Sequence, residues 1–398
     1  MEELFKWFYR QLKKTDMYLV RYLSPFINWD SRLLSITGAR GSGKTTMILQ
    51  YIKSTYGNTP RDVLYTSLDH LWFSSNRLYD LAVEFDKMGG RVLFLDEVHK
   101  YQNWSQEIKN IYDGFPDLKV VISGSSMLKI YRGYADLSRR LVNYSLEGMS
   151  FREYLKMEHK LDFQKISLED ILKNHVEITS AIIEKIKPIP AFNNYLKMGY
   201  YPYYKEDKFT YHLKLANTIN LILESDLPVI ENIELYSIAN IKKLLWIIST
   251  LVPFTPNISE LSGQIGISRN SLLNFLDILE RAGLINLLTS GSKGMSQLTK
   301  PEKIYLNNTN QIFTLGGDKS NIGNIRETFF FNQLKAVSNV NYTKITDFQV
   351  DDKYLFEVGG RSKNFQQIAG IENAYLAVDN IEYGFNNKIP LWLFGFLY

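Results

Sequence analysis

The segment from Gly38 to Thr45 constrains the fold of this chain more than any other. It has the pattern G-x-x-x-x-G-K-T, follows an apolar run (33–37) and precedes a segment with helical spacing (46–52). Glycines allow successive main-chain N–H groups to turn inward around an anion, and the start of a helix adds the positive end of its dipole. A strand, a glycine-rich loop and a helix in this order predict a phosphate-binding loop.

The residues of this loop have distinct expected tasks toward the phosphates of ATP. Lys44 would reach the β- and γ-phosphates, and the hydroxyl of Thr45 would ligate Mg²⁺. Arg40 contributes only its main chain in this interpretation. We expect the whole loop and the residue after it to bind the nucleotide: Gly38, Ala39, Arg40, Gly41, Ser42, Gly43, Lys44, Thr45 and Thr46.

Composition limits the class of protein. The chain has 398 residues, of which 45% are hydrophobic and 22% charged, and this suits two or three globular domains. A net charge of +4 is too small to argue for nucleic acid by itself. The absence of cysteine excludes disulfides and thiolate metal sites. With no long apolar run and no export pattern at the start, we expect a cytoplasmic protein without a membrane partner.

A second motif lies about 50 residues after the loop. The apolar run 92–95 predicts a buried strand, and it is followed by Asp96 and Glu97. Acids at the carboxyl end of a parallel strand face the crevice where ligands of such sheets bind. Asp96 would hold Mg²⁺, directly or through water, and Glu97 would polarise the attacking water. The pair extends the prediction from nucleotide binding to Mg²⁺-dependent hydrolysis.

Two further polar positions are candidates for the same site. The predicted strand 118–122 is followed by small polar residues, among which Ser125 could orient the water or contact the γ-phosphate, although such residues also simply favour turns. Arg139 and Arg140 follow near a turn. An arginine could stabilise the transferring phosphoryl group within its own chain or from a neighbouring copy, or the two could be a solvated surface pair.

The order of the predicted elements indicates an α/β fold with several parts. Strands and helices alternate through residues 33–125, which predicts a parallel sheet built from βαβ units. An aromatic-rich helical region with several prolines follows, and then three helices with a hairpin in the pattern of a winged helix. We expect an ATPase core (1–155), a helical lid or connector (156–235), a winged helix (236–308) and a small C-terminal domain (309–398).

Taken together, these segments resemble a prokaryotic family of AAA-type ATPases related to the signal-transduction ATPases with numerous domains. The matching stretches are 38–46, 95–104, 122–126, 138–154 and 199–202. The chain departs from the family at Arg139, where glycine is usual, whereas Arg140 keeps its arginine and is therefore the better candidate of the two. Gly148 stands in place of a proline and Tyr200 in place of a glycine. The resemblance implies an ATPase core, a winged-helix connector and a C-terminal domain resembling restriction-endonuclease folds.

Residues of the C-terminal part invite a nuclease interpretation. Metal-dependent nucleases of that fold use an acid on a helix, an Asp on one strand and Glu-x-Lys on the next, and Glu327, Asp347 and Glu357 match the three acids. Position 359 is glycine, so the lysine is missing, and Arg361 or Lys363 would have to reach in from the following loop. The alternative is a domain that kept the fold and lost the chemistry.

The sequence leaves three functions open. The first is a switch protein that binds and hydrolyses ATP with Mg²⁺ and couples its nucleotide state to the C-terminal domains. The second is a nuclease licensed by ATP, with nucleic acid bound by the winged helix or the last domain. The third is a scaffold that binds nucleotide for stability without turnover. For the winged helix, the alternative to DNA binding is a structural role or contact with a protein partner. The predicted third helix of the winged helix carries Asp277 and Glu280, which oppose DNA binding.

Overall fold

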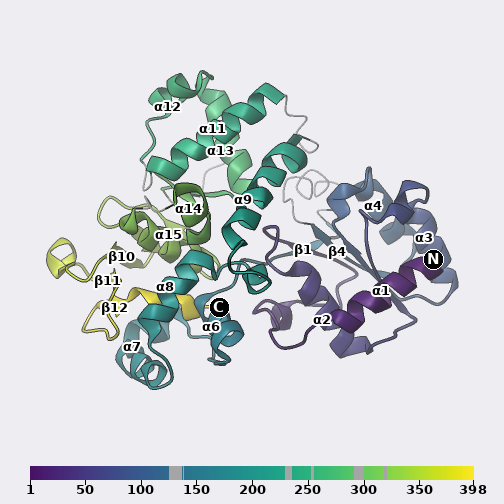
Figure 1. Cartoon of the computed structure of the whole chain (residues 1–398), viewed down its shortest axis with the longest axis horizontal. Helices are drawn as coiled ribbons and strands as arrows, with labels where there is room; N and C mark the ends of the chain where they lie inside the picture. The colour runs from purple at the N-terminus through teal and green to yellow at the C-terminus, as the bar shows by residue number, and fades with distance from the viewer. Residues whose placement is uncertain (125–136, 138, 229–234, 252–254, 291–299, 318–320) are drawn as a thin grey trace. The chain divides into compact units, whose positions relative to one another are not determined.

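The computed structural model describes residues 1–124, 137, 139–228, 235–251, 255–290, 300–317 and 321–398. The chain divides into two compact units, Met1–Gly148 and Met149–Tyr398, and each is described by itself (Figure 1). The predicted domain boundaries at 155, 235 and 308 stay predictions.

The first unit is built around a parallel sheet. Its strands are β1 (Leu33–Thr37), β2 (Val63–Ser67), β3 (Val92–Asp96), β4 (Lys119–Gly124) and β5 (Val142–Ser145). Its helices are α1 (Glu2–Lys14), α2 (Lys44–Tyr56), α3 (Leu78–Lys87) and α4 (Trp104–Gly114). The strand order is β2-β3-β4-β1-β5, and every neighbouring pair is parallel. The predicted α/β architecture is confirmed for this unit.

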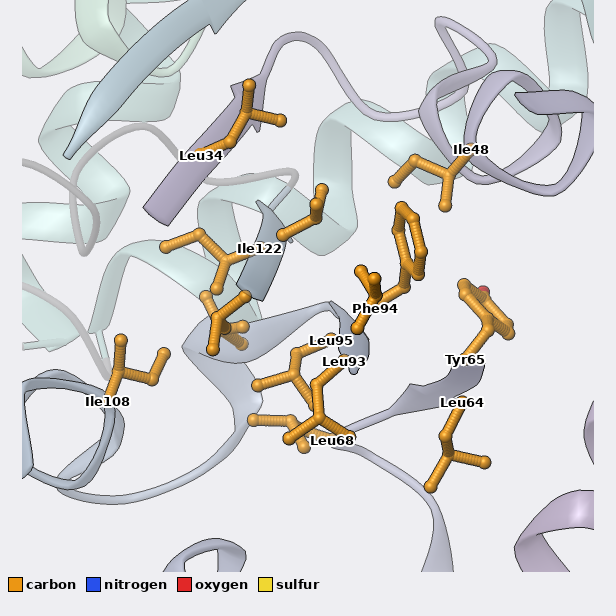
Figure 2. Close-up of a cluster of buried hydrophobic side chains, with 14 of the residues drawn as sticks. Leu34, Ile48, Leu64, Tyr65, Leu68, Leu93, Phe94, Leu95, Ile108 and Ile122 are labelled. Atoms are coloured by element: carbon orange, nitrogen blue, oxygen red, sulfur yellow. The ribbon is translucent and has the colours of Figure 1, made fainter. Parts of the chain in front are cut away.

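The central strands form because both of their faces are covered. Every residue of β1, β2 and β3 is buried, which explains the continuous apolar runs that predicted them. Figure 2 shows Phe94 and Tyr65 pointing to the same side as Ile48 of α2, whereas Leu93 points to the side of Ile108 of α4. Helices thus cover both faces of the sheet.

Strand β5 has no counterpart in the sequence prediction. It comprises the four residues Val142–Ser145, of which three are exposed. It pairs with β1 at the edge of the sheet, with Leu34 opposite Val142 and Thr37 opposite Ser145. A short exposed edge strand lacks the alternation of apolar and polar residues by which strands are predicted. It is defined only by its pairing with the neighbouring strand.

The second unit combines helices with two smaller sheets. Its helices are α6 (Phe151–His159), α7 (Leu168–Ile183), α8 (Pro188–Met198), α9 (Tyr211–Leu221), α11 (Leu235–Leu251), α12 (Ile258–Ile265), α13 (Arg269–Arg281), α14 (Thr309–Gly316) and α15 (Ile322–Lys335). Strands β6 (Ile285–Leu288) and β7 (Lys303–Leu306) form an antiparallel pair. The predicted three helices and hairpin are therefore present as elements, and their assignment as a winged helix stays a prediction.

A second five-stranded sheet lies in the C-terminal part. It has the order β12-β11-β10-β9-β8, formed by β8 (Val340–Asn341), β9 (Phe348–Val350), β10 (Tyr354–Gly359), β11 (Ala374–Val378) and β12 (Lys388–Pro390). Helix α15 packs on it through Phe330, whose ring centroid lies 5.0 Å from that of Phe356 and 5.3 Å from that of Phe348. This packing brings α15, β9 and β10 together: α15 carries Glu327, β10 carries Glu357, and Asp347 directly precedes β9.

A buried amide joins the helical and C-terminal segments of the second unit. The Oδ1 of Asn310 on α14 accepts hydrogen bonds from the main-chain N–H of Tyr200 (2.9 Å) and the hydroxyl of Tyr211 (2.5 Å). Its Nδ2 donates to the carbonyl of Leu196 at 2.9 Å. Because an unpaired buried amide is costly, this network fixes α8, α9 and α14 relative to one another. None of the helices formed by the described residues is long and apolar enough to cross a membrane.

The close approach of Gly38 to β5 generates a stability prediction. Gly38 has φ +150°, and a Cβ there would overlap the carbonyl oxygen of Leu146. We expect Gly38→Ala to lower the free energy of unfolding of the first unit by about 1–3 kcal/mol, because the strand end must shift. Gly114→Ala is the matched control, since its Cβ would meet only the Tyr79 hydroxyl, at 3.8 Å. Urea unfolding measures both, and equal losses would contradict the overlap.

Candidate nucleotide-binding and hydrolysis site

The predicted phosphate loop has the expected geometry. Strand β1 ends at Thr37 and α2 begins at Lys44, so the loop joins the carboxyl end of a central strand to a helix N-terminus. Gly41 and Gly43 have φ values of +82° and +96°, which residues with a Cβ rarely adopt. The glycines of the motif are therefore required by the backbone path. The loop and helix start form the cradle that binds phosphate in such folds.

Lys44 lies beneath this loop. Its side chain is 5% exposed, and its Nζ donates hydrogen bonds to the carbonyls of Gly38 at 2.9 Å and Ala39 at 3.0 Å. Burial lowers the pKa of Lys44, and the nearby carboxylates of Glu97 and Asp96 oppose that shift. The ammonium group is thus held at the loop by neutral carbonyls, which a phosphate group could replace with a stronger charge-assisted contact.

The carboxylate of Asp96 connects the four central elements of the site. It is 2% exposed at the end of β3. Its Oδ2 accepts from the Thr45 hydroxyl at 2.5 Å and from the Tyr65 hydroxyl at 2.8 Å. Its Oδ1 accepts from the Ser123 hydroxyl and from the Glu97 N–H at 3.0 Å. The structure therefore brings the two predicted Mg²⁺ ligands, Thr45 and Asp96, into direct contact.

Tyr65 and Ser123 were missed by the sequence analysis. Tyr65 lies on β2 and Ser123 on β4, the strands on either side of β3. Burial and the adjacent Asp96 carboxylate raise the pKa of Tyr65 well above its ordinary value, so its hydroxyl stays a hydrogen-bond donor at neutral pH. No local pattern marks Tyr65, whereas Ser123 belongs to the small polar run after the predicted strand 118–122, from which Ser125 was chosen instead.

Glu97 follows Asp96 in a left-handed conformation, with φ 52° and ψ 38°. This conformation is uncommon for a residue with a side chain and typical of functional turns. Its Oε2 lies 3.2 Å from Nε2 of His99, which is buried, whereas the Glu97 side chain is 21% exposed. The predicted base is therefore accessible to water and oriented by a neighbouring imidazole. From its position just after the acids, His99 is equally compatible with a packing or loop residue and with a coupling element.

The donor set at Thr45 and Asp96 fits a magnesium ion. Mg²⁺ prefers oxygen ligands and usually takes one or two from the protein, completing its shell with phosphates and water. A hydroxyl and a carboxylate in contact next to a phosphate loop supply that share. No group of three or more His, Asp or Glu side chains gathers to hold a metal within the described part of the chain, and this chemistry does not require one.

The structure does not place the predicted residues Ser125 and Arg140 at the phosphate loop. Ser125 lies outside the described residues. Arg140 is not brought to the phosphate loop of its own chain: its Nε and Nη2 donate to Asp113 at 3.0 and 3.1 Å, at the end of α4. That helix end lies by the amino ends of the strands, where Arg32 before β1 donates to the carbonyl of Tyr112 at 2.6 Å. Arg139 is exposed.

The tentative nuclease acids of the second unit pair with two different lysines: Glu357 with Lys363, and Glu327 and Asp347 with Lys303. Lys363 extends over Gly359, so close that a Cβ at Gly359 would lie 2.9 Å from its side-chain carbons. Its Nζ lies 2.5 Å from Oε1 of Glu357. Lys363 thus fills the place of the lysine that the sequence lacks at position 359. This supports the expectation that a loop residue could reach in.

A second lysine occupies the space between the other two acids. The Nζ of Lys303 on β7 lies 3.1 Å from Oε2 of Glu327 and 3.0 Å from Oδ1 of Asp347. Burial and the neighbouring Asp347 raise the pKa of Glu327, and Lys303 opposes that shift. A divalent ion would have to displace this ammonium group. As they stand, these residues do not fit a metal, and they form an ion-pair cluster.

The two acids expected on the outer face of α13 both have partners in the structure. Glu280 accepts a hydrogen bond from the main-chain N–H of Leu287 on β6 at 2.9 Å, and burial raises its pKa. It is therefore a tie between helix and strand rather than a surface acid. Asp277 forms an ion pair with Arg281 at 2.7 Å. The acidic character that argued against DNA at this helix is weaker than the sequence indicated.

Sequence comparison agrees with the geometry of the first unit. Residues 30–155 match the profile of a family described as an AAA domain, and residues 189–314 match a domain of unknown function (DUF8612). The phosphate loop, the Asp96–Glu97 strand end and this match support an AAA-type P-loop ATPase fold for the first unit. The winged helix and the nuclease-like C-terminal domain that the resemblance implies stay predictions.

One relative and two solved structures show how far the similarity of this chain to other proteins extends. An uncharacterized protein of Methanocaldococcus jannaschii, MJ1637, is 24% identical over 332 residues, which cover 76% of this chain and 70% of that protein. Among solved structures, the Walker-type ATPase PABY2304 of Pyrococcus abyssi has a TM-score of 0.38 and 11% identity, covering 78% of this chain and 94% of that one. AMPPCP-bound DnaA from Aquifex aeolicus has a TM-score of 0.26 and 14% identity, covering 70% and 88%.

The Tyr65–Asp96 hydrogen bond generates a prediction for the metal site. We expect Tyr65→Phe to lower the free energy of unfolding by about 1 kcal/mol and to raise the Mg²⁺ concentration needed for nucleotide binding by roughly fivefold, because Asp96 loses a partner that orients it. Tyr9→Phe is the matched control, since its hydroxyl donates to the Pro60 carbonyl at 2.9 Å. Fluorescence titration of an ATP analogue at varied Mg²⁺ separates them. The same Mg²⁺ requirement in both variants would contradict this role of Tyr65.

The Lys303 cluster generates a second prediction. We expect Lys303→Met to lower the free energy of unfolding of the second unit by about 2–4 kcal/mol, because two acids lose their shared cation. The loss should shrink as the pH falls through the raised pKa of Glu327, since protonation removes the repulsion. Denaturant unfolding at several pH values measures this change.

Two further variants control for the loss of the lysine side chain. Lys335→Met removes a lysine that donates to Asn286 at 2.6 Å and acts on a single acid, Glu280, so its cost should be smaller and should change less with pH than that of Lys303→Met. Adding Glu327→Gln to Lys303→Met should restore part of the stability. If the double variant is no more stable than Lys303→Met alone, the cluster is not held by charge compensation.

Proposed function

We propose that this chain is an ATP-driven switch protein, which binds ATP through the phosphate loop, hydrolyses it with Mg²⁺ and couples the nucleotide state to its C-terminal parts. The observation that carries the proposal is the contact of Thr45 with Asp96, at 2.5 Å, beside the buried Lys44 and next to Glu97. Phosphate binding, metal binding and activation of water thus have candidate residues on adjoining elements.

The chain's own residues have the following roles in this proposal. The loop N–H groups and Lys44 bind the phosphates and place the γ-phosphate at the end of β3. Thr45 and Asp96 would hold Mg²⁺, which neutralises phosphate charge. Glu97 orients the attacking water and accepts its proton, and His99 positions the Glu97 carboxylate. The fixed hydrogen bonds to Asp96 keep this arrangement pre-organised.

Two further residues stay proposals with different support. Ser125 is proposed on its sequence position alone, as a contact to the γ-phosphate or the water. Arg140 is proposed only as a residue acting from a neighbouring copy, because within its own chain it is paired with Asp113. A bidentate pair of this kind holds the guanidinium firmly, so donating it to another site requires that pair to open.

For the partner that responds to the nucleotide state, we propose only its class. The three helices and hairpin formed by residues 235–306 could contact a nucleic acid or a protein partner. Nuclease cleavage at Glu327, Asp347 and Glu357 is not included in the proposal, because Lys303 already neutralises two of these acids. Comparing ATP turnover with and without DNA separates a nucleic-acid partner from a protein partner.

The central prediction concerns two variants of the site. We expect Lys44→Ala to abolish ATP binding, and Glu97→Gln to keep binding while lowering turnover roughly a hundredfold or more, because the amide cannot accept the proton. Glu84→Gln is the matched control, an exposed glutamate on α3 of the same unit, and should leave turnover unchanged. Calorimetry measures binding, and phosphate release measures turnover.

Two results would contradict parts of the proposal. Unchanged turnover in Glu97→Gln would overturn the assignment of Glu97 as the base. ATP binding by the native chain with no turnover above background would overturn hydrolysis altogether and favour the scaffold alternative.

A further inference from the structure

One buried arginine contacts the phosphate loop from outside the motif. Arg21 lies between α1 and β1, and its side chain is 3% exposed. One terminal nitrogen, Nη1, donates to the main-chain carbonyl of Ser42 within the loop. The other, Nη2, donates to the carbonyls of Glu147 at 2.8 Å and Gly148 at 2.9 Å. A single guanidinium group therefore bridges the loop and the last residues of the first unit.

The same stretch, 146–148, touches the loop region at other points. The Leu146 N–H donates to the Thr37 carbonyl at 2.8 Å, and the Leu146 carbonyl closes over Gly38. The Glu147 N–H donates to the hydroxyl of Tyr22, the neighbour of Arg21, at 3.3 Å. The residues that end this unit are thus fixed by contacts at the start of the phosphate loop and by Arg21 at its centre.

The guanidinium group is suited to transmit a displacement. It is planar, permanently charged and rigid, so its two terminal nitrogens cannot move independently. Buried carbonyls that lose a donor become costly, which favours keeping all three contacts together. A phosphate group that draws the loop N–H groups inward would reposition the Ser42 peptide. Arg21 would then pass the shift to the Glu147 and Gly148 carbonyls.

We propose that Arg21 is a positioning residue that couples occupation of the phosphate loop by nucleotide to the conformation of residues 146–148. The inference rests on the proposed function for nucleotide binding and adds to it the residue through which the loop acts on the end of its unit. Coupling of this kind is reciprocal, so constraints on 146–148 also change the affinity of the loop for nucleotide.

The test compares hydrogen exchange and binding in the full chain. The probe is a non-hydrolysable ATP analogue with Mg²⁺, at a concentration that saturates each variant. Exchange is followed in two peptides, one over the loop (38–46) and one over the end of the unit (142–150). Arg21→Ala removes the bridge, and Arg21→Lys keeps the charge without the planar fork.

Arg32→Ala is the matched control. Arg32 belongs to the same unit and lies at the amino ends of the strands, away from the phosphate loop. It donates from Nη2 to the main-chain carbonyls of Tyr112 at 2.6 Å and Phe115 at 3.3 Å. It loses comparable hydrogen bonds without touching the phosphate loop. A general loss of stability therefore affects Arg21→Ala and Arg32→Ala alike, whereas coupling affects only Arg21→Ala.

We expect nucleotide to slow exchange in both peptides of the native chain and of Arg32→Ala. In Arg21→Ala, binding should weaken roughly tenfold, and at saturation the loop peptide should stay protected while 142–150 no longer responds. Arg21→Lys should show a reduced response, and it carries the test if Arg21→Ala does not fold. A full response of 142–150 in a folded Arg21 variant would overturn the coupling role. No binding by the native chain would instead overturn the proposed function, and this inference with it.

Discussion

The hydrogen bonds to the Asp96 carboxylate hold the whole site together. Asp96 ends β3, and its partners lie on the first turn of α2 (Thr45), on β2 (Tyr65) and on β4 (Ser123). A carboxyl group this deeply buried is tolerable only when its oxygens are hydrogen-bonded. The sheet order therefore has a chemical consequence, because the strands on both sides of β3 supply two of these three hydroxyls. The first turn of the helix after the phosphate loop and Asp96, the proposed metal-binding acid, are in turn held together by a hydrogen bond of the protein itself.

The two ends of the sheet in the first unit have different tasks. At the carboxyl ends of the strands lie the loop, Asp96 and Glu97, with Arg21 joining them to the residues that end the unit. At the amino ends, Arg32 and Arg140 bind groups at the end of α4 and fasten helix to sheet. Both sets use arginine, and only the position relative to strand direction separates the functional set from the structural one. This geometry explains why Arg140, a plausible catalytic arginine by sequence, lies away from the site.

Local sequence predicted the parts of the fold and site that depend on local chemistry. The loop 38–45 and the acids after β3 carry their own signals, in glycine conformation and in an apolar run ending in carboxylates. Tyr65 and Arg21 carry none, because each acts on a residue far away in the chain through strand order or a buried bridge. Ser123 lies in the small polar run after the predicted strand, but only strand order shows that it, and not its neighbours alone, bonds Asp96. Edge strand β5 was missed for the same reason. Lys363 shows the converse. The sequence has glycine and no lysine at position 359, but the side chain of Lys363 from the following loop lies over Gly359 and contacts Glu357.

A comparison of the two carboxylate sites explains why one suits a divalent ion and the other does not. Around Asp96, the described hydrogen bonds come from neutral hydroxyls and a main-chain N–H, and the nearby Lys44 is bonded to loop carbonyls. A cation entering there gains charge compensation that the protein has not already supplied. Between Glu327 and Asp347, an ammonium group supplies it in place. An incoming metal ion would have to displace the ammonium group of Lys303 and leave it partly buried without its acids. The free energy lost in this way would cancel much of the free energy gained by binding the metal. The two acidic sites thus differ in their capacity for a divalent ion because a lysine already neutralises Glu327 and Asp347, whereas Lys44 is bonded to loop carbonyls and not to Asp96.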